Sequence, residues 1–196
     1  LAGDKSIGIY SVGTVPQNIN NTGIVKIGDS SNTSDPGIGI YSAVAGSTVT
    51  NSGTVESGIN SIGIYNNLGT VISNGTAIHN IGNAGVGIYS TGGIVNLNTG
   101  SAFNMGTSGA VAVYGVSSAV NNSTNLNIGN SNYGFILKGG SLTNAAGTNS
   151  SIGTDSVYMY STEGTAVTND GTVIMSGADN VGFYMAQDPV SGVGGA

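Results

Sequence analysis

The side chains that could carry chemistry in this chain are few: nine carboxylates, three lysines, nine tyrosines and one histidine. Enzymes that cleave polysaccharides use clustered carboxylates together with a cationic residue in one groove. Here the carboxylates are spread thinly, and only Asp155 and Asp179 share a position, five residues before the end of a repeated tetrad. Stacked repeats would place this pair about 5 Å apart, one strand spacing. We interpret them as solvated loop aspartates, and a glycosidase or cation site is the alternative.

The sequence contains no motif for metal or nucleotide binding. His79 has no second histidine and no cysteine to share a zinc ion or a nucleophilic triad with, so we expect it at the surface or at a corner. The absence of cysteine excludes disulfides and thiolate sites. No glycine-rich segment leads into the Lys-Ser/Thr of a phosphate loop, and the G-G-x-G-x-D calcium nonapeptide is missing. We therefore expect neither a cofactor nor a metal.

Charge excludes further classes of partner. The net charge is −6, and only 6% of the residues are charged. Lys5, Lys26 and Lys138 are isolated from one another, whereas phosphate backbones and anionic membranes need clustered basic residues. We expect no nucleic acid partner. No run of 18 apolar residues is present, so the sequence predicts no membrane-spanning helix.

A tetrad of the type Ile-Gly-Ile-Tyr repeats along the chain and must set the positions of all these groups. Its first copy is Ile7–Tyr10, and the intervals between copies are 31 residues at first and then 22 to 25. The last residues of the eight copies are Tyr10, Tyr41, Tyr65, Tyr89, Tyr114, Ile136, Tyr160 and Tyr184. Such a period is typical of a solenoid.

Alternation within the tetrad predicts strands with one buried face. We expect the first and third residues, such as Ile38 and Ile40, to face inward, and the glycine and tyrosine to face outward or lie at a corner. A second motif, as in Asn51-Ser52-Gly53, follows about half a repeat later and predicts corners with positive φ at Asn and Gly. Together these features predict an all-β parallel β-helix (β-solenoid) with about 24 residues per coil and seven to eight coils. The extra residues of the first interval, Gly28–Pro36, predict a projecting loop.

The I-G-I-Y repeats with interspersed N-x-G-T-V segments resemble the passenger region of large bacterial autotransporter (type V secretion) adhesins of oral Gram-negative anaerobes. The resemblance covers essentially the whole chain and implies a right-handed coil. It also implies an extracellular location on the bacterial cell surface, a role in virulence, and a C-terminal outer-membrane β-barrel translocator in the full-length chain. The ends, Leu1-Ala2-Gly3 and Val190–Ala196, indicate that residues 1–196 are a single β-solenoid fragment of a longer passenger domain.

The tyrosine column is the most promising binding feature. An outward row of Tyr41, Tyr65, Tyr89 and Tyr114 would form an aromatic stripe suited to sugars or proteins. The other interpretation is packing, with each ring over a neighbouring glycine, and the break at Ile136 favours it. We add Asp29 and Asp35 of the projecting loop as candidate ligand-binding residues.

The sequence thus predicts a non-enzymatic adhesin segment that attaches to host cells or partner bacteria through many weak contacts with a surface receptor, protein or glycan. A carbohydrate-active β-helix enzyme is one alternative, and a purely structural stalk or spacer is another. Exposed edge strands also make self-association of the fragment plausible.

Overall fold

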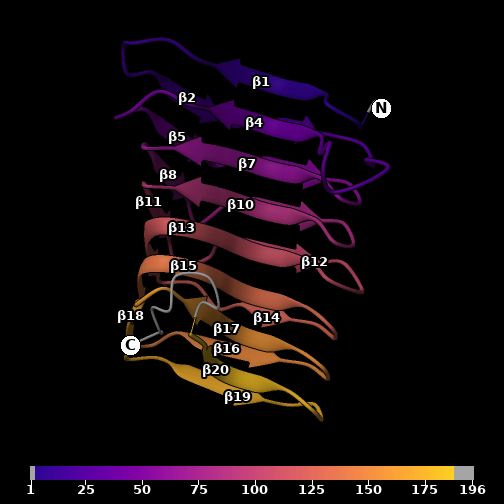
Figure 1. Ribbon diagram of the computed structural model, residues 1–196, viewed down its shortest axis with the longest axis vertical. Coiled ribbons are helices and arrows are strands. Elements are labelled where there is room, and N and C mark those ends of the chain that lie inside the picture. The colour runs from indigo at the N-terminus through magenta and orange to yellow at the C-terminus, as the bar shows by residue number, and fades with distance from the viewer. Residues whose placement is uncertain (1–2, 188–196) are drawn as a thin grey trace.

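The computed structural model describes residues 3–187 and contains twenty β-strands and no helix over that range. Leu1, Ala2 and residues 188–196, which include the C-terminal segment from Val190 that indicated a fragment, lie outside the described residues. The strands stack as the coils of a solenoid, one above another along the long axis (Figure 1). Each coil has three faces, which we call the first, second and third face.

The first face stacks eight strands: β1 (Ile7–Ser11), β4 (Ile38–Ser42), β7 (Ile62–Asn67), β10 (Val86–Thr91), the first halves of β13 (Val111–Asn122) and β15 (Tyr133–Asn144), β17 (Val157–Thr162) and β20 (Val181–Met185). The second face stacks β2 (Asn18–Asn21), β5 (Thr48–Asn51), β8 (Thr70–Ser73), β11 (Ile94–Leu97), the second halves of β13 and β15, and β18 (Ala166–Asn169). The third face stacks β3 (Ile24–Lys26), β6 (Thr54–Ser57), β9 (Ile78–Ile81) and β12 (Ala102–Met105), and then a separate sheet of β14 (Asn127–Ile128), β16 (Asn149–Ile152) and β19 (Thr172–Met175).

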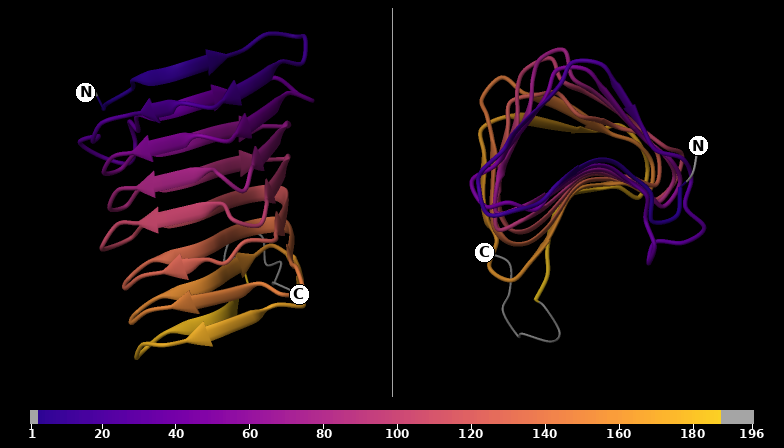
Figure 2. Two further views of the ribbon diagram at one scale, coloured as in Figure 1. Left: turned by 180° about the vertical axis from the view of Figure 1, so that it is seen from behind. Right: turned by 90° about the horizontal axis from the view of Figure 1, so that it is seen from above.

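Every strand pair is parallel, and the register places tetrad on tetrad. Tyr41 pairs with Tyr65, and Tyr65 with Tyr89, so one coil advances the chain by about 24 residues. The predicted parallel β-solenoid and its coil length are confirmed. Residues 27–37 form the predicted loop between β3 and β4, which projects beyond the outline of the coils when the molecule is viewed along its axis (Figure 2).

The core is a column of apolar side chains with one layer per coil. Each layer takes one residue from the first face and one from each of the others, such as Ile64, Val71 and Val55, which are at most 1% exposed. Seen along the axis, the first face curves inward, so the outline of a coil is concave on that side (Figure 2).

The inward and outward positions of the tetrad differ from the prediction at two of its four residues. The third residue, as in Ile40 and Ile64, is fully buried, and the tyrosine faces outward, as predicted. The glycine, however, faces inward: a Cβ on Gly39 would meet Val55 Cγ1 of the third face at 3.4 Å. The first residue, as in Ile62, is only partly buried and shares the outer surface with the tyrosines.

The reason is a local break in alternation. The ladder pairs Ile38 with Ile62 and Ile40 with Ile64 and skips the glycine between them. Two consecutive residues then face inward, as in a β-bulge, which bends the strand. At Gly39 this position is crowded, because a Cβ there would lie 2.6 Å from the carbonyl oxygen of Gly63.

The corners after the second face also differ from the prediction. Neither Asn51 nor Gly53 has a positive φ, whereas Gly100, in the Asn98-Thr99-Gly100 copy of the motif, does. Instead, buried asparagine amides at this corner donate hydrogen bonds along the axis to the next coil, as from Asn122 Nδ2 to Asn144 Oδ1 at 2.7 Å. These bonds satisfy polar groups that would otherwise be costly to bury.

Candidate ligand-binding face

A ladder of tyrosines lies on the concave first face. Consecutive rings from Tyr10 to Tyr114 are stacked, with centroid separations of 4.8 to 5.3 Å, and Tyr160 stacks on Tyr184 at 5.4 Å. The parallel register produces this arrangement, because each strand places its tyrosine directly above the previous one. We call these residues, together with Ile136 at the same position, the tyrosine ladder.

The ladder both packs and remains accessible. Tyr41, Tyr65, Tyr89 and Tyr114 are partly buried by their neighbours, while Tyr10 at one end is 61% exposed. Burial and neighbouring phenols raise the pKa of Tyr41, Tyr65 and Tyr89 above its usual value. The rings pack on one another and not over the neighbouring glycines, as the packing interpretation had it, because the glycines face inward. The outer edges of the rings, with the hydroxyl groups, form a row along the concave face.

An apolar row runs beside the ladder. It consists of the first residues of the tetrads, including Ile38, Ile62 and Val86, which the sequence pattern had placed in the core. Ile62 and Val86 line a hollow of about 190 Å³ together with Tyr89 and Tyr114. The concave face is therefore a strip of mixed aromatic and aliphatic character.

The projecting loop forms one side of this hollow through Thr33 and Pro36. The two loop aspartates are engaged elsewhere. Asp35 is ion-paired with Lys5 at 3.1 Å, and Asp29 Oδ1 accepts a hydrogen bond from the Ile59 N–H at 2.7 Å. The structure thus brings the loop, but not the Asp29 and Asp35 carboxylates, to the ladder, and we interpret the carboxylates as fixing the loop.

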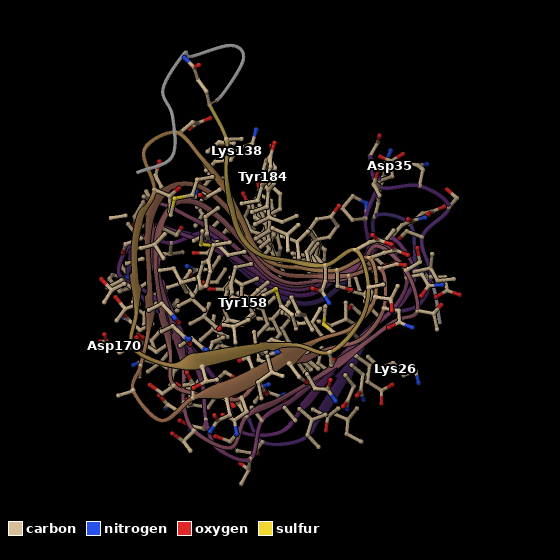
Figure 3. All side chains as sticks on the ribbon, turned by 90° about the horizontal axis from the view of Figure 1, so that it is seen from below. Lys26, Asp35, Lys138, Tyr158, Asp170 and Tyr184 are labelled. Carbon is tan, nitrogen blue, oxygen red and sulfur yellow. The ribbon has the colours of Figure 1, made fainter. Side chains whose placement is uncertain are left out.

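Lys138 on β15 is a residue of this face that sequence reasoning passed over as an isolated lysine. In Figure 3 it lies on the concave side together with Tyr184, while Lys26 lies on the opposite side. Its ammonium lowers the pKa of Tyr89 against the larger effects of burial and of Tyr114, so the two groups are within electrostatic reach. Its position two residues after Ile136 was a usable signal, because residues two apart on a strand share a side.

Asp155 and Asp179 occupy exposed corners before β17 and β20. Both have φ of +54°, and Asn60, Ala84 and Ser131 have nearly the same φ at the equivalent corner of other coils. Aspartate tolerates this left-handed conformation, so turn geometry accounts for the pair. Within residues 3–187 no group of three or more His, Asp or Glu side chains is arranged to hold a metal ion.

His79 is not at the surface or a corner, as expected, but inside the solenoid. His79 is only 1% exposed, Nε2 lies 2.8 Å from Ser73 Oγ, and the ring stacks on Phe103 at 4.5 Å. Its partners come from other segments of the fold, which a search for neighbouring metal ligands in the sequence does not consider.

The fold and this face define a β-solenoid protein with an aromatic ladder along its concave side. Comparison with protein family models, with curated proteins and with solved structures finds no match to the chain. Among the described residues we find no helix with the length and hydrophobicity that a membrane crossing requires.

Proposed function

We propose that this chain is a segment of a cell-surface adhesin of the autotransporter type, which attaches bacteria to host cells or to partner bacteria through its concave face. The observation that carries the proposal is the tyrosine ladder with the apolar row beside it. Continuous exposed apolar strips on a soluble surface mark interaction sites. Tyrosine supplies large, rigid contact area at low entropic cost, and repetition along the rod lets many weak contacts act together.

The contrast with the other faces favours a binding segment over a plain spacer. Outward residues of the second and third faces include polar rows, in which Asn121 donates to Asn96 at 2.9 Å and Asn104 donates to Asn80 at 2.7 Å. Exposed apolar residues on these faces, such as Ile78 and Ile94, pair with Thr or Ala in the neighbouring coils instead of forming a continuous strip. A spacer needs only such polar surfaces. The surface location and a C-terminal outer-membrane β-barrel elsewhere in the full-length chain are part of the proposal and follow from the resemblance of the repeats.

The test is attachment of the purified chain to intact epithelial cells and to partner bacteria, compared with a Tyr41→Ala/Tyr65→Ala/Tyr89→Ala variant. We expect saturable binding by the parent and its loss in the variant. The matched control is Ile78→Ala/Ile94→Ala, which removes exposed apolar side chains from the third and second faces. Circular dichroism first establishes that all variants are folded. Binding that survives in the triple variant, or a parent that binds neither cell type, contradicts the proposal.

A further inference from the structure

The tyrosine ladder lacks one ring, at the coil where Ile136 takes the ladder position. Tyr114 pairs in register with Ile136, and Ile136 pairs with Tyr160. Ring stacking ends at Tyr114 on one side and resumes with Tyr160 on the other. No ring contact joins the two runs in the described structure, so one face of Tyr114 and one face of Tyr160 look toward each other across Ile136.

The space between these two faces has the size of one ring. The missing position is bounded by residues two strand spacings apart, about 10 Å along the axis. Each position of the ladder elsewhere holds a tyrosine ring, and stacked neighbours are 4.8 to 5.4 Å apart. An isoleucine side chain is shorter than tyrosine, so it fills only the inner part of the position. The register and these side-chain sizes together imply a notch with an aliphatic floor and two aromatic walls.

A positive charge lies beside the notch. Lys138 follows Ile136 by two residues on β15 and lies on the same concave side (Figure 3). The other two lysines are ion-paired, Lys5 with Asp35 and Lys26 with Glu56. Glu163 follows Thr162, the register partner of Lys138, yet within residues 3–187 no ion pair joins Glu163 to Lys138. On a chain of net charge −6, this ammonium is the group available to an anionic ligand.

We propose that the notch at Ile136 binds a carboxylated sugar ring, of the sialic or uronic acid class, within a cell-surface glycan. The C–H faces of the sugar pack against the rings of Tyr114 and Tyr160, and its carboxylate pairs with Lys138. The phenol hydroxyls at the rim exchange hydrogen bonds with the sugar hydroxyls. An apolar aromatic side chain of a protein partner would fill the same space but leave the ammonium and hydroxyls without partners. This inference rests on the proposed adhesin function and names the ligand of its concave face.

Filling the notch tests the proposal. Ile136→Tyr completes the ladder with the residue that the neighbouring coils carry, so we expect it to fold. Binding of sialyllactose and of a glucuronate disaccharide, with lactose as the neutral comparison, is measured by isothermal titration and saturation-transfer NMR. We expect the parent to prefer the acidic sugars, and Ile136→Tyr to weaken their binding about tenfold or more, as loss of a stacked and charge-paired site implies.

Two further variants separate shape from charge. Ile136→Val keeps the notch open and is expected to bind as the parent does. Lys138→Gln keeps the side-chain length and is expected to remove the preference for acidic over neutral sugar. Unchanged affinity in folded Ile136→Tyr, equal binding of acidic and neutral sugars by the parent, or no binding of either acidic sugar overturns the inference. If sugar binding fails while the parent still attaches to cells, the notch proposal falls and the adhesin proposal stands; if attachment fails too, both fall.

Discussion

At the residue scale, His79 is the group whose environment departs furthest from that of a free side chain. It replaces an apolar residue of the third face, since its register neighbours are Val55 and Phe103. Ser73 Oγ contacts Nε2, and Nδ1 has no hydrogen-bond partner. Burial without a counter-charge lowers the pKa of His79 from 6.5 to about 3, so the ring stays neutral in the folded protein.

This depressed pKa predicts acid sensitivity. The unfolded chain binds a proton on His79 near pH 6.5 and the folded protein only near pH 3. The stability that the neutral ring provides is therefore complete above pH 6.5 and is lost as the pH falls toward 3. Between pH 7 and pH 4 the loss from this residue amounts to about 3 kcal/mol.

Urea unfolding of the parent and of His79→Val at both pH values measures this loss. Valine is the residue at the same position one coil earlier, so it fits the layer. The parent is expected to lose about 3 kcal/mol more than the variant on acidification. Equal losses in the two proteins would show that the proton on His79 does not limit stability.

At the element scale, the tetrad shows which structural features could be predicted from the sequence alone. The repeat period, the strands and the stacking of Tyr41 on Tyr65 could be predicted, because parallel β-coils place equivalent residues above one another. The inward glycine could not, because strict alternation assigns it to the side of the tyrosine. One sequence signal for an inward position was Tyr158, a large aromatic residue at the glycine position. In the structure it is 0% exposed and makes edge-on ring contacts with Phe135 and Phe183.

The apolar row beside the tyrosine ladder could not be predicted for the same reason. Since the strand bends at the glycine, Ile62 and Val86 move from the expected core to the concave surface beside the ladder. The hydrogen bond of Asp29 and the ion pair of Asp35 could not be predicted either, because their partners, Ile59 and Lys5, lie in other coils. Sequence patterns specify the repeat well and the departures from it poorly.

The glycine column gives the second prediction. A Cβ on Gly63 would lie 2.6 Å from the Gly87 carbonyl oxygen and 3.1 Å from Val55 Cγ1. Gly63→Ala is expected to destabilise the protein by about 1–3 kcal/mol, the usual cost of overpacking. The control is Gly182→Ala at the equivalent position of β20, where a Cβ would meet nothing within 4 Å. Thermal unfolding that shifts equally for both variants would contradict the inward position of the column.

At the scale of the whole molecule, the rod is not equally strong along its length. β13 and β15 run without a break through the first and second faces, paired from Val111–Tyr133 to Asn122–Asn144. At the same level the third face is interrupted, since no backbone hydrogen bond joins β12 to β14 in the part of the chain that is described. A hollow lined by Phe103, Met105 and Asn127 lies between these two strands.

The interruption predicts an uneven pattern of amide exchange. In a solenoid each coil is held by its two neighbours, so local opening follows the number of continuous ladders at that level. Amides of β13 and β15 are expected to exchange most slowly, because two faces act there as one long ladder. Those of β14 are expected to exchange faster than those of β9, which has a paired strand on both sides. Hydrogen–deuterium exchange with peptide-level mass spectrometry measures both comparisons. Equal protection of β14 and β9 would mean that the third face is continuous in solution. All three faces would then carry load along the rod, whereas the interrupted third face leaves that load chiefly to the first and second faces.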